Sequence, residues 1–154
     1  MNRPGPARTR RLLEKLRERV PGIAIRTTLL TGFPGETEDD FEELLAFVEE
    51  SRFDHLGVFA FSAEDGTRAA RMQGQLPAKV RGERRRRLMA AQRKVSAEAN
   101  RRRIGERKTL LIDSAGAGGV WIARHEGQAP EVDGVTKIEV TGERTLGPGR
   151  FCDA

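Results

Sequence analysis

The sequence predicts an α/β fold in two parts: an incomplete βα unit with parallel strands, followed by a small antiparallel β-barrel. Up to about residue 61, apolar residues at helical spacing alternate with short β-rich runs, the rhythm of a parallel sheet with helical crossovers. A long helical pattern then runs from Pro77 to about Arg103. After Gly105 the apolar period changes to two, between glycine-containing turns, as in a small barrel. We therefore expect two domains, residues 1–104 and 105–154.

The first part begins with an expected helix and contains two expected strands. The helix ends at Pro21-Gly22, which stops it. Residues 23–30 form a β-rich run without a break, and residues 53–61 form another, so both suit buried parallel strands. Because two strands cannot form a sheet that is covered on both faces, we expect the α/β part to be incomplete. The apolar stripe of the first helix comprises Leu12, Leu13, Leu16 and Val20.

Two further helices are expected in this part. Thr37 is placed as an N-cap with Asp40 three residues later, and acidic residues 38–40 favour the positive end of the helix. The second helix is the long one from Pro77, which Gly105 suits as a C-terminal cap. The expected buried faces are Phe41, Leu44, Leu45 and Val48 in the first of these, and Val80, Leu88, Ala91, Val95 and Ala99 in the second. In the second part, alternating runs predict strands at 109–113, 119–124 and 135–141.

Composition excludes several classes of function. The chain has 154 residues, 28 Lys and Arg against 23 Asp and Glu, and one cysteine. One cysteine excludes an internal disulfide, a thiolate zinc site and an iron–sulfur cluster held by this chain. No apolar run approaches the length of a membrane span, and the first twenty residues lack a secretory signal. We therefore expect a cytoplasmic protein without a membrane partner.

The isolated candidates for chemistry have simpler structural interpretations. His55 and His125 lack neighbours at metal-ligand spacing, so structural or surface roles are expected. Cys152 suits a half-buried strand position, and Trp121 suits a core position more than a stacking platform. Arg84–Arg87 are expected to form a solvated helix face, as are the acidic residues between 38 and 50.

The most informative stretch is Gly32-Phe33-Pro34-Gly35-Glu36-Thr37. A glycine loop after a parallel strand lies where open α/β sheets and α/β barrels bind ligands. Glycines let the backbone approach a ligand, and Phe33-Pro34 provide an apolar surface for an aromatic base. Taken alone, the hexapeptide favours a plain βα turn with a helix cap.

The surroundings of this loop resemble a known family. Residues 1–4, a helix, residues 23–28 and the loop up to Thr37 together resemble the second half of a radical-SAM barrel, specifically that of the methylthiotransferase family. Residues 61–67, with Ala69 after them, resemble its sixth-strand segment, although Phe61 stands where the family usually has Tyr. Residues from Gly105 onward resemble the TRAM domain, the β-barrel appended to these enzymes. Residues 129–134, Ala-Pro-Glu-Val-Asp-Gly, resemble the RimO-type subgroup, which modifies an aspartate of a small-subunit ribosomal protein.

This resemblance implies a function and its cofactors. The complete enzyme uses S-adenosylmethionine and two 4Fe–4S clusters, and the cysteines that bind those clusters in the family are absent from this sequence. We therefore expect this sequence to be a piece of a longer protein and to stop before the last TRAM strand. We expect no catalytic and no metal-binding residue in it, and no activity of this chain alone. Gly32, Phe33, Pro34, Gly35, Glu36 and Phe61 are the expected cofactor-binding residues, and Glu131 and Asp133 the expected substrate-docking residues.

Two alternatives stay open. A transfer RNA methylthiotransferase of the same family would have the same architecture. A non-catalytic RNA-binding module is the other, because residues 77–108 carry thirteen cations against three anions. Residues 109–154 carry four cations against seven anions and few aromatic residues, which favours a basic protein client over RNA.

Overall fold

The computed structural model describes residues 6–140 and 146–154. Its backbone divides into two compact units, the first ending at Arg102 and the second beginning at Arg103. None of the helices described is long and apolar enough to cross a membrane.

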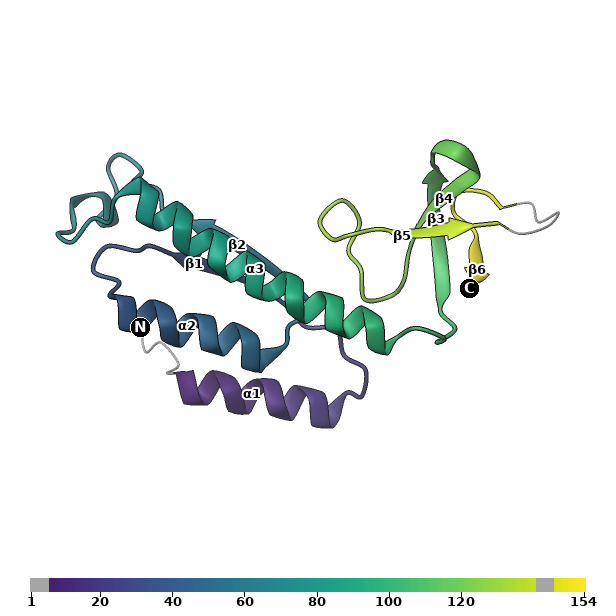
Figure 1. Ribbon diagram of the computed structural model, residues 1–154, viewed down its shortest axis with the longest axis horizontal. Helices are drawn as coiled ribbons and strands as arrows, with labels where there is room; N and C mark the ends of the chain where they lie inside the picture. Colours follow the sequence, from purple (N-terminus) through teal and green to yellow (C-terminus); the bar gives the residue numbers. More distant parts are fainter. Residues whose placement is uncertain (1–5, 141–145) are drawn as a thin grey trace. The chain divides into compact units, whose positions relative to one another are not determined.

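The first unit is a parallel pair of strands with helices on one side (Figure 1). Strands β1 and β2 pair in parallel with Arg26 beside His55 and Thr31 beside Ala60, and α2 connects them. Parallel pairing requires such a crossover, because a tight turn cannot return the chain in the same direction. The elements are α1 (Pro6–Arg19), β1 (Arg26–Thr31), α2 (Glu38–Ser51), β2 (His55–Ala60), a short 3₁₀ helix (Ala69–Arg71) and α3 (Ala78–Arg102).

Helix α2 begins with the predicted cap. The hydroxyl of Thr37 accepts a hydrogen bond from the Asp40 backbone N–H at 3.1 Å, and the Asp40 carboxylate accepts one from the Thr37 N–H at 2.9 Å. This reciprocal capping box satisfies two backbone donors at the helix start. The helix ends at Ser51, and the C-cap residue Arg52 adopts a left-handed conformation with φ 47°.

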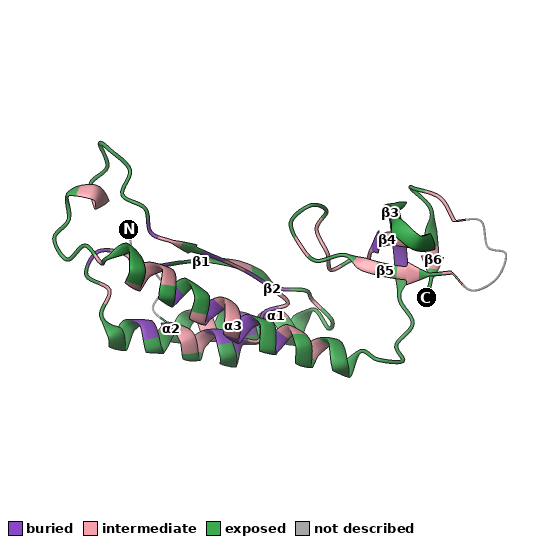
Figure 2. Ribbon diagram, turned by 45° about the horizontal axis from the view of Figure 1, so that its top comes forward, coloured by how far each residue is buried: buried purple, intermediate pink, exposed green. Residues whose placement is uncertain are grey.

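The core of this unit lies between the sheet and the two later helices (Figure 2). Phe41, Val48 and Leu88 are fully buried, and Leu44 and Leu45 pack against them. The predicted apolar faces of α2 and α3 are therefore confirmed. The predicted stripe of α1 is only partly right: Leu13 is buried with Ile25 and Phe53, but Leu12 and Val20 are exposed.

The prediction that both strands are buried is wrong. Burial alternates along β1 and β2, and Leu30 and Phe59, which pair side by side, are 49% and 63% exposed. Successive side chains of a strand point to opposite faces of the sheet, and α2 and α3 cover one face only. Within the part of the chain that the structure describes, the other face of this two-stranded sheet is exposed.

The second unit is an antiparallel half-barrel. Its four strands lie in the order β5-β4-β3-β6, with every neighbouring pair antiparallel. Leu110, Ile112 and Ala123 are its buried apolar residues. A bulge between Ile112 and Ser114 shifts the pairing of β3 with β4. The strands are β3 (Thr109–Ala115), β4 (Val120–Arg124), β5 (Thr136–Glu139) and β6 (Phe151–Asp153), with a 3₁₀ turn at Ala117–Gly119; Thr141, the predicted end of β5, lies outside the described residues.

Candidate functional site

The candidate site lies where β1 and β2 end. The loop 32–37 follows β1 directly, and Phe61 follows β2. The N–H of Phe61 donates to the carbonyl of Thr31 at 2.8 Å, so the pairing of the strands continues up to the loop. The sheet thus holds the two predicted cofactor-binding segments side by side.

The carboxylate of Glu36 is turned back onto its own loop. Its Oε1 accepts hydrogen bonds from the Thr31 hydroxyl at 3.0 Å, from the Gly32 N–H at 2.9 Å and from Arg84 Nη1 at 2.6 Å. The Glu36 side chain is 12% exposed. With these three donors around one oxygen, Glu36 closes the loop onto the end of β1.

Arg84 supplies the charge that allows this carboxylate to be buried. It is 5% exposed, and its Nη2 donates to Glu38 at 2.8 Å while its Nη1 also reaches the Glu36 carbonyl at 3.1 Å. Its guanidinium carbon lies 5.1 Å from the centroid of the Phe41 ring. The prediction of a solvated face is therefore wrong for Arg84, because a buried ion is tolerated only where it is paired and hydrogen-bonded.

Charge partners shift the pKa values around Arg84. Burial lowers the pKa of Arg84, but hydrogen bonds to Glu38 and Glu36 outweigh it and raise that pKa above the ordinary value. The hydrogen bond from Arg84 lowers the pKa of Glu38. Arg84 and Glu38 are therefore both charged at neutral pH.

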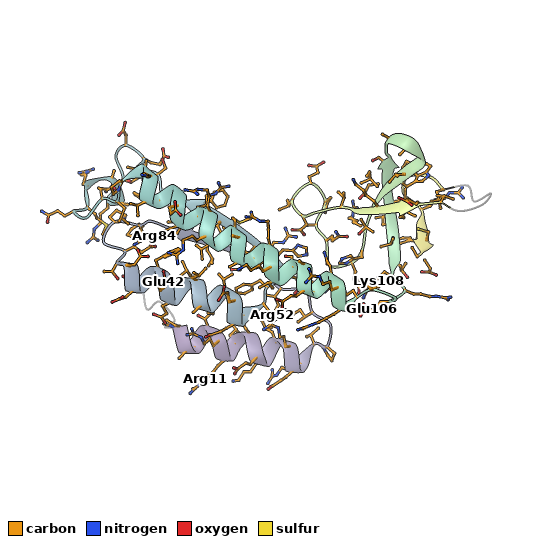
Figure 3. All side chains as sticks on the ribbon, in the orientation of Figure 1. Arg11, Glu42, Arg52, Arg84, Glu106 and Lys108 are labelled. Atoms are coloured by element: carbon orange, nitrogen blue, oxygen red, sulfur yellow. The ribbon has the colours of Figure 1, made fainter. Side chains whose placement is uncertain are left out.

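Figure 3 labels Arg84 on α3 and Glu42 on the neighbouring α2. Arg87 makes a second link between these two helices. Its Nη2 donates to Glu42 at 2.6 Å and its Nη1 to Glu38 at 3.3 Å, and its guanidinium lies 4.7 Å from the Phe41 ring centroid. Glu38 and Glu42 are thus paired with arginines of α3, yet their side chains stay 61% and 49% exposed, so the predicted solvated acidic face is confirmed at these two positions.

Arg81 fixes the first glycine of the loop. Its guanidinium donates to the carbonyl of Phe61 and lies 6.0 Å from the Phe61 ring centroid. A Cβ at Gly32 would lie 2.5 Å from Arg81 Cγ, and Gly32 has φ +76°. Gly32 is therefore required both by its backbone conformation and by the close approach of Arg81.

The second glycine of the loop contacts the segment that precedes α3. The Gly35 N–H donates to the carbonyl of Gly74 at 2.9 Å. A Cβ at Gly74 would meet the backbone of Gly35 at 3.1 Å. The segment before α3 thus packs against the loop and is hydrogen-bonded to it at Gly35.

An aromatic pair forms the apolar part of the site. The rings of Phe33 and Phe61 meet edge to face, with centroids 5.3 Å apart at 72°. Phe61 and Pro34 are buried, while Phe33 is half-buried. The structure therefore brings all six predicted cofactor-binding residues to one place, with Glu36 turned inward.

Arg81 and Arg84 are the residues that sequence reasoning missed. They extend the apolar stripe of α3 toward its start, at the spacing of three and four residues that also separates Leu88, Ala91 and Val95. That spacing was the signal available to identify them as inward-facing.

The predicted docking residues lie in a loop of the second unit. The Asp133 carboxylate accepts a hydrogen bond from the Ala129 N–H at 2.7 Å, so it shapes the loop. Gln128 adds a bond to the Gly134 carbonyl at 2.6 Å. Glu131 is exposed and has φ 62°, and Val132 beside it is 72% exposed. The loop therefore presents Glu131 and Val132, whereas Asp133 holds it together.

The described residues contain no group of three His, Cys, Asp or Glu that could hold a metal ion. Cys152 is half-buried on β6, as predicted. His125 Nδ1 accepts a hydrogen bond from the Gly127 N–H at 3.0 Å, which gives this histidine a structural role in a turn.

Comparison with known proteins finds two kinds of similarity. Residues 104–154 match the family model of the TRAM domain. Curated proteins named ribosomal protein uS12 methylthiotransferase RimO match nearly the whole chain. The protein of Anaeromyxobacter sp. (strain Fw109-5) is 51% identical over 131 residues, which cover 84% of this chain and 28% of that protein. The protein of Pelotomaculum thermopropionicum is 46% identical over 98% of this chain and 34% of its own length. The chain spans about a third of the length of the curated relatives it matches.

Proposed function

Because this chain belongs to the ribosomal protein uS12 methylthiotransferase RimO family and corresponds to its C-terminal portion with the TRAM domain, we propose that it forms one wall of the S-adenosylmethionine site of such an enzyme. The observation that carries the proposal is the loop 32–36, held at the ends of two parallel strands beside Phe61. Ligands of α/β folds bind at this end of the strands.

The residues present fit S-adenosylmethionine. Phe33 offers a half-buried aromatic surface next to Phe61, suited to packing against adenine. The Nε–H of Arg81 is buried without a hydrogen-bond partner among the described residues, which leaves one donor at this edge of the sheet. When bound, the cofactor would supply the radical and methyl chemistry of the family.

The residues of the loop divide this work between contact and positioning. Phe33 and Phe61 are proposed to contact the cofactor, and Gly32 and Gly35 to let the backbone approach it. Pro34 is the buried residue between them. Glu36 is a positioning residue, because its Oε1 is engaged by three donors of the protein itself.

The residues of this chain do not fit an iron–sulfur cluster. A 4Fe–4S cluster takes cysteine thiolates as ligands, and the chain has only Cys152, which lies on β6 of the second unit. We therefore expect this chain alone to be inactive, because its own residues can hold neither cluster of the family.

The second unit is proposed to dock the substrate, an aspartate-bearing segment of ribosomal protein uS12. Residues 109–154 carry more anions than cations, and Glu131 is exposed in a hydrogen-bonded loop. Such a surface complements a basic protein. Transfer RNA is the alternative substrate within the family and would be repelled by the same charge.

A chimera tests the proposal. This chain would replace the matching third of the Pelotomaculum relative, and the product would be assayed on uS12 by mass spectrometry and on transfer RNA by nucleoside analysis. Methylthiolated uS12 with unmodified transfer RNA is expected. Modification of transfer RNA alone would favour transfer RNA as the substrate. A chimera that folds but modifies neither substrate would contradict the proposal.

A further inference from the structure

The cations of α3 separate into two groups that face different ways. Arg81, Arg84 and Arg87 turn toward the loop 32–37, Phe61 and α2. The other seven cations of the helix are exposed: Lys79, Arg85, Arg86, Arg93, Lys94, Arg101 and Arg102. Of these, Arg85 also donates from its Nε to the Val58 carbonyl of β2 at 3.0 Å. The outward surface of α3 is therefore strongly basic even when Arg81, Arg84 and Arg87 are left out.

These exposed cations are arranged in rows along the helix. Lys79, Arg86 and Arg93 follow at intervals of seven residues, as do Lys94 and Arg101. Seven residues are about two helical turns, so each row places a charge about every 10 Å along one side. A depression of about 570 Å³ lies on this helix, and Arg85, Arg86 and Arg93 line it together with Glu83 and Arg87.

Few anions oppose this surface. Glu83 pairs with Arg86 at 2.5 Å, and Glu98 is engaged by Arg52 at 2.7 Å. Arg93 and Lys94 have no carboxylate partner within the described part of the chain. Their charges are consequently available to an external polyanion.

The chemistry of the surface selects the kind of polyanion. No large apolar side chain of α3 is exposed, whereas protein interfaces depend on buried aromatic and apolar anchors and amphipathic membrane helices need an apolar face. No aromatic residue lies in α3, so bases have no platform for stacking. Arginine-rich rows without apolar anchors suit phosphates, which guanidinium groups bind with paired hydrogen bonds.

We propose that the outward surface of α3, centred on Arg93 and Lys94, binds the phosphodiester backbone of RNA without sequence preference. The evidence for this basic surface does not depend on the methylthiotransferase assignment. Only the choice of RNA over DNA rests on the proposed function, because a ribosomal protein substrate is found among RNA.

The test uses the full chain and a labelled oligouridine, with binding followed by fluorescence anisotropy. Each phosphate contact with a single strand contributes about 0.7 to the slope of log K against log salt, which is about fivefold in affinity at about 0.1 M salt. Arg93→Gln with Lys94→Gln should therefore weaken binding about 25-fold and reduce the slope by about 1.4.

The matched control is Arg11→Gln with Lys15→Gln, which removes two exposed cations from α1. This variant should bind oligouridine within about twofold of the parent, because its cations lie off the proposed surface. Far-ultraviolet circular dichroism checks that both variants keep their helices. Equal weakening in the two variants would overturn the proposal, as would polyglutamate displacing the RNA at the same charge concentration.

Oligothymidine is the arm that decides between RNA and DNA. Binding of oligouridine at least as tight as that of oligothymidine supports RNA, and tighter binding of oligothymidine overturns that choice. These outcomes are separate from the chimera experiment, since a chimera that modifies uS12 leaves the α3 surface to be decided by anisotropy alone.

Discussion

Arg84 and Glu36 are 48 residues apart in sequence, and their guanidinium and carboxylate groups lie 2.6 Å apart in a place where both side chains are largely buried. This pair joins α3 to the loop that follows β1. The shape of the loop therefore depends on a helix from a distant part of the sequence.

Replacing Arg84 should destabilise the first unit strongly. Arg84→Met leaves the Glu36 carboxylate buried without its cation, which costs about 3 kcal/mol in the free energy of unfolding. The control, Arg86→Met, removes an arginine whose side chain is 69% exposed and should cost less than about 1 kcal/mol. Urea denaturation of the two variants measures the difference, and equal losses would show that burial adds nothing to this pair.

The two glycines of the loop should respond differently to alanine. Both have positive φ, so each substitution costs about 1 kcal/mol in backbone strain. Only at Gly32 does the new Cβ also collide with Arg81, since nothing lies within 4 Å at Gly35. Gly32→Ala should thus lower the melting temperature clearly more than Gly35→Ala does. Equal losses would mean that Arg81 moves aside without cost, and the opposite order would contradict the prediction.

The start of α2 should weaken in acid. The hydrogen bond from the Thr37 N–H lowers the pKa of Asp40 below its ordinary 3.8, and the bond from Arg84 lowers the pKa of Glu38 below 4.5. Because the unfolded chain binds these protons at higher pH, stability is complete above the ordinary values and is lost as the pH falls through the lowered ones. Asp40→Asn should flatten this acid dependence, measured by urea denaturation between about pH 5 and 3. Asp39→Asn, the matched control, removes the same charge beside the cap but neither of the two cap hydrogen bonds.

Iron–sulfur reconstitution should fail with this chain alone. One thiol cannot replace the set of cysteine ligands that a 4Fe–4S cluster takes. Anaerobic incubation with iron and sulfide, followed by iron analysis and an assay for 5′-deoxyadenosine, is expected to give neither a stoichiometric cluster nor product. A stoichiometric cluster, or 5′-deoxyadenosine in stoichiometric amount, would contradict this prediction.

Reversing one charge in the docking loop should weaken substrate binding. In the chimera, Glu131→Lys is expected to lower the affinity for uS12 severalfold, mainly through slower association, because complementary charges steer encounter. Glu139→Lys reverses an exposed charge on β5 and serves as the control. Binding kinetics at two salt concentrations measure both variants, and an unchanged association rate for Glu131→Lys would contradict the docking assignment. Asp133 is unsuited to this test, because its carboxylate holds the loop in shape.

Much of the fold could be predicted from local patterns. The Thr37–Asp40 cap and the buried face of α2 depend on residues three or four positions apart, which sequence spacing reveals directly. Burial of the strands could not be predicted in this way. A run of β-rich residues suits a strand covered on both faces, but coverage depends on which helices pack against it, and Leu30 and Phe59 remain exposed.

The site shows the same limit more sharply. Four consecutive arginines differ by about 100° each around a helix, so Arg84 faces the core while Arg86 faces solvent. The sequence predicted Glu36 as a cofactor-binding residue but did not show that its carboxylate is bound by Arg84. That contact joins α3 to the loop after β1, and no local pattern specifies a pair so distant.

The position of α3 at the end of the first unit has a consequence during synthesis. The segment β1-α2-β2 is complete before α3 leaves the ribosome, yet Phe41 on α2 is buried in a cluster with Leu88 and Ala91 of α3. Until those residues emerge, the apolar side of α2 has no cover and Glu36 has no cation. The nascent chain therefore depends on α3 to cover the apolar side of α2. A pause in translation before residue 88 would leave a partly folded intermediate with exposed apolar surface, which is prone to aggregation and is the kind of species that chaperones bind.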